Sequence, residues 1–391
     1  MQKLISILMF SLFFYSFTMG QDDSLLLIPY PRQIVYDEGT FTFTPSTSLG
    51  ITDSENWNIL FAADELFKEV KNRYKLPFNY GKSFKKSNIL IGTFGVNKFF
   101  DRKVKDIPEK DLKKTGKEGY ILSIQQEEII LVANTDTGVF YGIQTLKQLI
   151  RANSKGTSIP CLTINDWPAM RYRGWQDDIS RGPIPTLEFL KKEIKILSEY
   201  KLNAFTLYTE HVFKLDKHPG ITPPDGITKE EIIELVEYAK NYHIEIIGNF
   251  QSFGHFARIL QIPEYTHLSE TPHVITPAKE ESYKFLEDVY SEIAPAYESK
   301  LFNINCDEVS GLGTGPAKEM FDTLGKEGLY AYHINRIYDL LKPYGKTMMM
   351  WGDIARDYPE IIPKLPKDLI VLPWGYHPGK SFEADIVPFV E

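Results

Sequence analysis

The pattern of hydrophobic and polar positions divides the chain into two regions. In residues 21–165, apolar strand-like runs occur at 88–94 and twice within 119–134, and helical spacing occurs at 62–70 and 137–150. Mixed strands and helices over this length predict a small α+β domain.

Residues 166–391 show a more regular alternation of short apolar runs with helical segments. Leu187, Leu190, Ile194 and Leu197 follow helical spacing, and a further helix is predicted to begin with a capping box at residues 228–231. Six strands are predicted, at 172–178, 203–210, 244–250, 301–306, 347–351 and 369–374. Repeated βα units indicate a parallel sheet, either closed as a (β/α)8 barrel or open and doubly wound.

Polar or aromatic residues lie at or just after the C-terminal end of nearly every predicted strand, and active sites of barrels lie at that end. They are Asp177, Asp178, Glu210, His211, Gln251, His255, Asp307, Glu308, Trp351, Asp353, Trp374 and Tyr376. No G-x-G-x-x-G follows the first strand, as dinucleotide binding would require. The pattern favours a TIM-type (β/α)8 barrel. Only six strands are found, so we expect a barrel truncated after about six βα units, unless two strands have merged with others.

The N-terminus is typical of a secretory signal peptide. Lys3 precedes an uncharged, mostly apolar stretch at 4–17, and small residues follow. The stretch is shorter than the ~20 residues that span a bilayer, although a membrane anchor is the alternative. We expect residues 1–20 to be removed and the chain to be exported, to the periplasm or the exterior, without a stable membrane span.

Composition excludes several classes of protein. The net charge of −8 argues against nucleic acid as a partner. The two cysteines, Cys161 and Cys306, are too few for a disulfide scaffold. No histidine or cysteine spacing resembles a zinc site, so neither a metal nor another cofactor is expected.

The strongest candidate chemistry lies in LFNINCDEVSGLGTG, residues 301–315, where Asp307 and Glu308 are adjacent. Neighbours on a regular strand point to opposite faces, so these two can share a site only where the strand ends. Gly311 and Gly313 are consistent with such an end. Neighbouring carboxylates repel, which separates an acid from a base, as glycoside hydrolysis needs. A solvated pair at a strand end fits these two residues equally well.

Several motifs together resemble a known family. INDWPAMRYRGWQDDISRG at 164–182, FQSFGHF at 250–256 and FNINCDEV at 302–309 are similar to segments of family 20 glycoside hydrolases, the β-N-acetylhexosaminidases. YTEHVF, QSFGH and CDEVSGLG are most similar to the hexosaminidase D-like branch. The resemblance covers nearly all of the chain after the signal peptide.

The resemblance implies a mechanism in which the substrate's own 2-acetamido oxygen attacks the anomeric carbon. Glu308 would be the general acid and later the base for water. Asp307 would orient the acetamido group and stabilise the oxazolinium nitrogen. Retention of configuration is implied.

The resemblance also implies substrate-binding residues. Arg173 would hold sugar hydroxyls, or else pair with Asp178. His255 and Glu210 would line the site after two of the strands, although a buried histidine in this position can belong to the core. Aromatic walls are expected from Trp351, Trp374 and Tyr376, of which the last two could be core residues instead.

We therefore expect an exo-acting β-N-acetylhexosaminidase that releases terminal GlcNAc or GalNAc from a glycan or oligosaccharide. The alternatives are a truncated, non-catalytic glycan-binding member of the family and a retaining glycosidase with its own nucleophile. The sequence gives no prediction of the oligomeric state.

Overall fold

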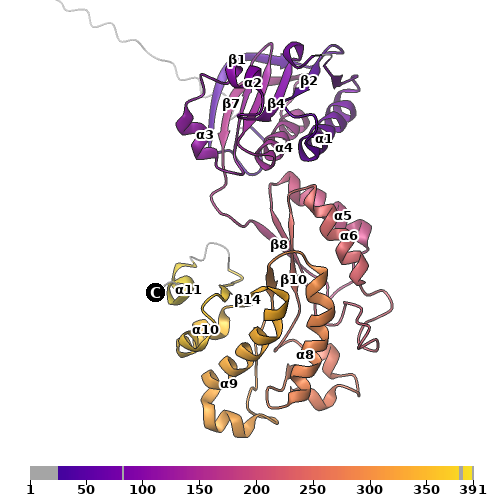
Figure 1. Ribbon diagram of the computed structural model, residues 1–391, viewed down its shortest axis with the longest axis vertical. Coiled ribbons are helices and arrows are strands. Elements are labelled where there is room, and N and C mark those ends of the chain that lie inside the picture. The colour runs from indigo at the N-terminus through magenta and orange to yellow at the C-terminus, as the bar shows by residue number, and fades with distance from the viewer. Residues whose placement is uncertain (1–24, 82, 378–381, 390–391) are drawn as a thin grey trace, which may run out of the picture.

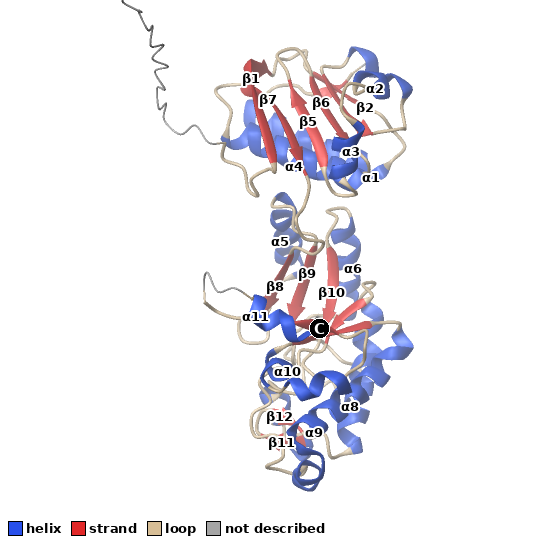
Figure 2. Ribbon diagram, turned by 90° about the vertical axis from the view of Figure 1, so that its left-hand side faces the viewer, coloured by secondary structure: helices blue, strands red, loops and turns tan. Residues whose placement is uncertain are grey.

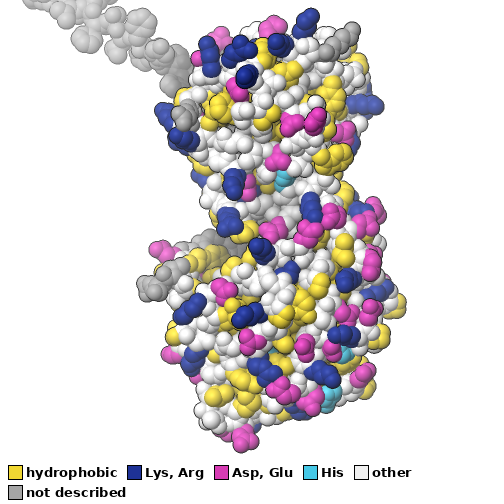
Figure 3. All heavy atoms as spheres, in the orientation of Figure 1, with side chains coloured by type: hydrophobic (Ala, Val, Ile, Leu, Met, Phe, Trp, Pro, Cys, Tyr) yellow, Lys and Arg dark blue, Asp and Glu magenta, His cyan; other side chains and the backbone are white. Residues whose placement is uncertain are grey.

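The computed structural model describes residues 25–81, 83–377 and 382–389. The expected signal peptide, residues 1–20, lies outside the described residues. Two domains are stacked along the long axis (Figure 1). The chain passes from the first to the second between residues 166 and 174. The space-filling view shows a waist between them, and basic and acidic side chains are intermixed over the visible face of both (Figure 3). In the described part of the chain, no helix has both the length and the apolar character needed to cross a membrane.

The first domain is built on a seven-stranded mixed sheet with the order β1-β7-β5-β6-β4-β2-β3. Its strands are β1 (Gln33–Thr42), β2 (Ser48–Ile51), β3 (Asn79–Tyr80), β4 (Ile89–Thr93), β5 (Tyr120–Ile124), β6 (Ile129–Ala133) and β7 (Ser158–Asp166). Its helices are α1 (Trp57–Tyr74), α2 (Lys98–Lys103), α3 (Glu109–Thr115) and α4 (Asp136–Ala152). Helices α1 and α4 pack on one face of the sheet (Figure 2), while α2 and α3 pack on the other. The expected small α+β domain is confirmed.

The second domain contains all six expected strands, in one parallel sheet with the sequential order β15-β14-β13-β10-β9-β8. They are β8 (Gly174–Asp178), β9 (Ala204–Tyr208), β10 (Glu245–Asn249), β13 (Leu301–Asn303), β14 (Thr347–Trp351) and β15 (Ile370–Leu372). A hairpin of β11 (Ser269–Thr271) and β12 (Val274–Ile275) is inserted after β10.

Helices follow these strands in turn: α5 (Leu187–Glu199), α6 (Lys229–Lys240), α7 (Ala257–Leu260), α8 (Glu280–Ile293), α9 (Lys318–Leu341), α10 (Asp353–Asp357) and α11 (Glu383–Ile386). The expected capping box of α6 is present. A doubly wound sheet reverses its strand order, whereas this order never reverses. The sheet is therefore part of a TIM-type barrel, and among the described residues β8 and β15 each pair on one side only.

Charged groups join the two domains, in one buried pair and one half-buried pair. Lys201, which precedes β9, donates from Nζ to Oδ2 of Asp166 at 2.8 Å and to the Tyr120 hydroxyl at 2.9 Å. Arg173, which precedes β8, forms an ion pair of 2.6 Å with Glu118. Buried pairs that lie between domains restrict the domains' relative orientation, because separating them leaves charges uncompensated.

Candidate active site

The residues that follow β13 end the strand abruptly. Asn305, Cys306 and Glu308 have positive φ angles of 60°, 62° and 49°. This left-handed conformation is uncommon for residues other than glycine and costs on the order of 1–3 kcal/mol at each position. The bend breaks the alternation of a regular strand, so that Asp307 and Glu308 both reach the side chain of His255.

Hydrogen bonds from three neighbouring elements hold this bent segment. Asn305 exchanges two amide hydrogen bonds of 3.0 Å with Asn249 at the end of β10. The hydroxyl of Tyr330 in α9 donates to the carbonyl of Cys306 at 2.9 Å. The N–H of Glu308 donates to Oδ2 of Asp353 at 3.1 Å. These contacts offset the backbone strain and fix the position of the carboxylate pair.

His255 lies between the two carboxylates. Its Nε2 is 3.3 Å from Oδ2 of Asp307 and 3.3 Å from Oε2 of Glu308. The hydrogen bond to Asp307 raises the pKa of His255 against the opposing effect of burial. The Asp307 side chain is 13% exposed and that of Glu308 is 52% exposed, so the pair has one enclosed and one accessible member.

A second group of polar side chains extends from Asp307 toward the ends of β8 and β9. Nε2 of Gln251 donates to Oδ1 of Asp307 at 3.4 Å and also to the hydroxyl of Tyr208. Nη2 of Arg181 donates to the same hydroxyl at 2.8 Å. Burial raises the pKa of Tyr208 and keeps this hydroxyl neutral. Arg181 and Tyr208 were not among the predicted site residues. Both lie at carboxyl ends of strands, which was the signal that could have identified them.

The predicted aromatic residues lie at the carboxyl ends of β14 and β15. Nε1 of Trp351 donates to Oδ1 of Asn305 at 3.0 Å, so this indole supports the bent segment directly. Trp374 and Tyr376 contact each other edge to face, with ring centroids 5.2 Å apart. Tyr376 is 85% exposed and is therefore not a core residue.

Glu210 is buried after β9 and holds the segment that follows His255. Its Oε1 accepts hydrogen bonds from the N–H groups of Arg258 at 2.7 Å and Ile259 at 3.3 Å. Burial raises its pKa to about 7. These contacts place the carboxyl group beside the segment that follows His255 and indicate that it orders this backbone.

Arg173 requires a correction. The residue lies before β8, at the amino end of the strand, where its guanidinium donates to Oε2 of Glu118 and to the carbonyl of Lys201. This end of the sheet is opposite to the carboxylate pair, so Arg173 cannot reach a sugar bound there. The alternative partner was also wrong, because Asp178 pairs with Arg181 at 3.3 Å.

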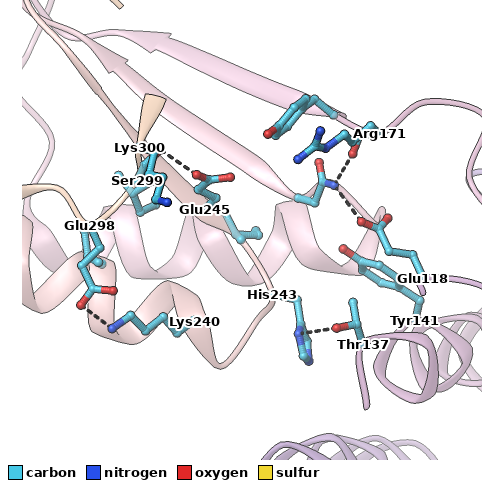
Figure 4. Close-up of a pocket in the computed structure, with 15 residues that line it drawn as sticks. Glu118, Thr137, Tyr141, Arg171, Lys240, His243, Glu245, Glu298, Ser299 and Lys300 are labelled. Atoms are coloured by element: carbon cyan, nitrogen blue, oxygen red, sulfur yellow. Dashed lines mark hydrogen bonds and ion pairs between the residues drawn. The ribbon is translucent and has the colours of Figure 1, made fainter. Parts of the chain in front are cut away.

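A cavity of about 560 Å³ lies between the domains (Figure 4). Neither Asp307 nor Glu308 lines it. Glu118, Thr137 and Tyr141 line it from the first domain, and His243 and Glu245 line it from the second. The barrel residues that line it precede or begin their strands, whereas the carboxylates follow theirs. The cavity and the pair therefore lie at opposite ends of the sheet.

The groups around the pair can transfer protons and bind a polar substrate. In the part of the chain that the structure describes, no cluster of three or more His, Cys, Asp or Glu side chains is arranged to hold a metal ion. The accessible carboxylate of Glu308, with an imidazole and a second carboxylate held beside it, is suited to general acid and base chemistry. A sheet of barrel topology with such groups at its carboxyl ends is the arrangement of a TIM-barrel enzyme.

Family models identify the chain more closely. The model "Glycosyl hydrolase family 20, domain 2" matches residues 25–167, and "Glycosyl hydrolase family 20, catalytic domain" matches residues 170–384. The chain belongs to glycosyl hydrolase family 20.

Individual relatives agree with this assignment. A β-hexosaminidase of Porphyromonas gingivalis is 25% identical over 377 residues, which cover 85% of this chain and 46% of the relative. One of Vibrio furnissii is 25% identical over 403 residues, covering 90% of this chain and 60% of the relative. The chain thus spans about half the length of the curated relatives it matches.

Solved structures show the same fold. A chitobiase of Flavobacterium johnsoniae superimposes with a TM-score of 0.76 at 24% identity, covering 91% of this chain and 56% of that protein. An exo β-N-acetylglucosaminidase of Vibrio harveyi, solved with N-acetylglucosamine, gives a TM-score of 0.73 at 22% identity and covers 93% and 58%.

Proposed function

We propose that this chain carries the activity of an exo-acting β-N-acetylhexosaminidase, which hydrolyses terminal β-linked GlcNAc or GalNAc by substrate-assisted, retaining catalysis. The observation that carries the proposal is the bend at 305–308, which brings Asp307 and Glu308 to one imidazole at the carboxyl ends of the strands. The activities for which the relatives are named support an amino sugar as the substrate and lend no support to a purely glycan-binding protein.

In this mechanism the 2-acetamido oxygen of the substrate forms a bond to the anomeric carbon as the glycosidic bond breaks. Glu308, the accessible carboxyl group, gives its proton to the leaving oxygen. Asp307, enclosed by His255 and Gln251, holds the acetamido N–H and balances the positive charge of the oxazolinium. Water then attacks the anomeric carbon and breaks its bond to the acetamido oxygen, while a proton of the water passes to Glu308. The acetamido group is regenerated and configuration is retained.

The location of the protein is part of the proposal. We propose export, to the periplasm or the exterior, on the basis of the predicted signal peptide at residues 1–20. Cell fractionation with and without residues 1–20 tests it, because a protein retained equally inside the cell in both forms would exclude export.

The experiment for the activity is an assay of residues 21–391 on 4-nitrophenyl β-N-acetylglucosaminide, its galacto epimer and the plain β-glucoside. We expect hydrolysis of the acetamido sugars alone, inhibition by a thiazoline mimic of the oxazolinium, and a loss of about 10²–10⁴-fold in kcat for Glu308→Gln. Glu127→Gln makes the same chemical change at an exposed position of the first domain and should be silent. Sugar binding without hydrolysis by the folded wild-type chain would overturn the proposal.

A further inference from the structure

The hairpin inserted after β10 places a buried carboxylate beside the loop that follows the catalytic pair. Glu270, in β11, is 5% exposed. Its Oε1 accepts from the N–H groups of Gly313 at 3.0 Å and Gly315 at 2.8 Å. Its Oε2 accepts from the N–H of Ala317 at 2.9 Å and the hydroxyl of Thr276 at 2.8 Å. One side chain thus satisfies three backbone donors of a single loop.

The loop is shaped to approach this carboxylate closely. Gly311 and Gly313 have φ angles of +77° and +84°, which residues other than glycine rarely adopt. A methyl group added at Gly315 would overlap the carbonyl oxygen of Glu270. The loop begins directly after Glu308, so whatever fixes the loop also fixes the position from which the general acid projects.

The same hairpin holds the segment that carries His255. The N–H of Phe256 donates to the carbonyl of His273 at 3.0 Å, and the N–H of Ile275 donates to the carbonyl of Phe253 at 3.0 Å. The hairpin therefore connects the backbone around His255 to the backbone that follows Glu308, and Glu270 is the side chain that makes the second connection.

We infer that Glu270 is a positioning residue for catalysis: it holds the loop 309–317 against the β11–β12 hairpin and so keeps Glu308 in register with His255. The inference rests on the proposed function, because it assigns Glu270 to the same reaction. The hydrogen bonds of the Glu270 side chain go to the loop and to Thr276 rather than to the pair, so it acts through the loop. A carboxylate suits this role because both of its oxygens only accept, as the three N–H donors and the hydroxyl require.

Glu270→Gln tests the inference with almost no change of shape. The glutamine amide can be oriented in two ways. In each, its NH2 group takes the place of one carboxylate oxygen and faces at least one backbone N–H of the loop, so at least one hydrogen bond to the loop is lost. We expect kcat to fall about 100-fold with KM nearly unchanged, because a small misplacement of a catalytic group affects the reaction step more than binding. We also expect hydrogen exchange to accelerate at the amides of Gly313, Gly315 and Ala317.

Glu65→Gln is the matched control, because it neutralises a carboxylate that is equally buried, at 3% exposure, in the first domain. This control should lower stability without changing kcat per folded molecule. Should Glu270→Gln not fold, Gly315→Ala displaces the loop from the other side of the same contact. Its control is Gly220→Ala, where an added methyl group meets nothing within 4 Å.

The outcomes separate the two proposals. If Glu270→Gln speeds hydrogen exchange in the loop but leaves kcat unchanged, Glu270 only stabilises the loop and the inference is overturned. Unchanged hydrogen exchange at the three amides would also overturn it. If the wild-type chain hydrolyses no amino sugar, the proposed function fails. Faster exchange confined to the three amides would then still identify Glu270 as the residue that orders this loop.

Discussion

Nε2 of His255 lies 3.3 Å from Oδ2 of Asp307, and this contact raises the pKa of the imidazole above its ordinary value of 6.5. The protonated form is therefore the form that the folded site favours. Below pH 6.5 the imidazole is charged whether or not it has a partner, and the stabilisation from the contact is fully present. As the pH rises through the raised pKa, the proton is lost and the stabilisation disappears.

We predict that His255→Gln lowers kcat/KM by about 10- to 100-fold near pH 6, because a hydrogen bond to a charged group is worth about 1.5–3 kcal/mol. In wild type, kcat/KM should decline above pH 6.5 as His255 loses its proton, and the variant should lack this part of the decline. Rates measured from pH 5 to 9 check both effects. The exposed His267→Gln is the control, and a wild-type pH profile in His255→Gln would contradict the prediction.

The correction at Arg173 leads to a paired prediction. The side chain of Arg181 is 56% exposed beside Tyr208, so its guanidinium is accessible to a bound sugar. Arg181→Lys should raise KM about tenfold, equivalent to about 1.4 kcal/mol, because an ammonium group does not reproduce the planar set of donors.

Arg173→Lys should leave KM unchanged and lower thermal stability instead. Its guanidinium donates to Glu118 and to the carbonyls of Lys201 and Met170, and lysine cannot satisfy all three acceptors. Kinetics and thermal denaturation of both variants decide the matter. A raised KM in Arg173→Lys alone would restore the original assignment.

Strand ends explain how much of this site the sequence could predict. The apolar runs of all six barrel strands are distinct, and polar residues follow them, so the position of Asp307, Glu308, His255 and Trp351 at one edge was predictable. Arg173 and Arg181 lie in one motif, however, and the predicted strand 172–178 contained Arg173. Because β8 begins at Gly174, Arg173 lies at the opposite end of the sheet. The predicted strand also has Arg173 near its amino end, so the pocket role came from the resemblance alone and was carried over to the arginine at the wrong end of the strand.

The bend at 305–308 could not be predicted, since cysteine and glutamate have no preference for a left-handed conformation and only the tertiary contacts of Asn305, Glu308 and Tyr330 impose it. In the first domain, β1 was missed for a different reason. Most of its side chains are exposed, so its sequence lacks the alternation that marks a half-buried strand.

Glu210 provides a prediction about stability. Burial raises its pKa to about 7 from an ordinary 4.5, so the folded chain keeps a proton that the unfolded chain loses between those values. Stability therefore falls as the pH rises from 4.5 to 7, by about 3 kcal/mol, and the cost stays constant at higher pH.

Glu210→Gln keeps an acceptor oxygen for the N–H groups of Arg258 and Ile259 but cannot ionise. We expect the free energies of unfolding of wild type and variant to differ least near pH 4.5. As the pH rises to 7, the variant should become more stable relative to wild type. Urea denaturation across this range measures the difference. The exposed Glu264→Gln should show the same pH dependence of stability as wild type. If Glu210→Gln also runs parallel to wild type, the raised pKa of Glu210 is not the cause of the pH dependence.

Lys201 provides the last prediction, at the junction of the domains. Burial lowers the pKa of its ammonium group, and the ion pair with Asp166 opposes this effect. Lys201→Met would leave the Asp166 carboxylate buried without its cation, which costs about 3–5 kcal/mol. Replacing both residues, as Lys201→Met with Asp166→Leu, should recover much of the loss, because the buried charge is then removed as well.

Chemical denaturation, with the fluorescence of each domain followed separately, measures this cost and shows whether the domains unfold together. Lys318→Met is the control, since that lysine is 62% exposed and its pair with Asp322 should contribute no more than about 1 kcal/mol. If the double variant were no more stable than Lys201→Met, the loss would come from packing at the junction. The paired charges would then not be what fixes the barrel domain against the first domain.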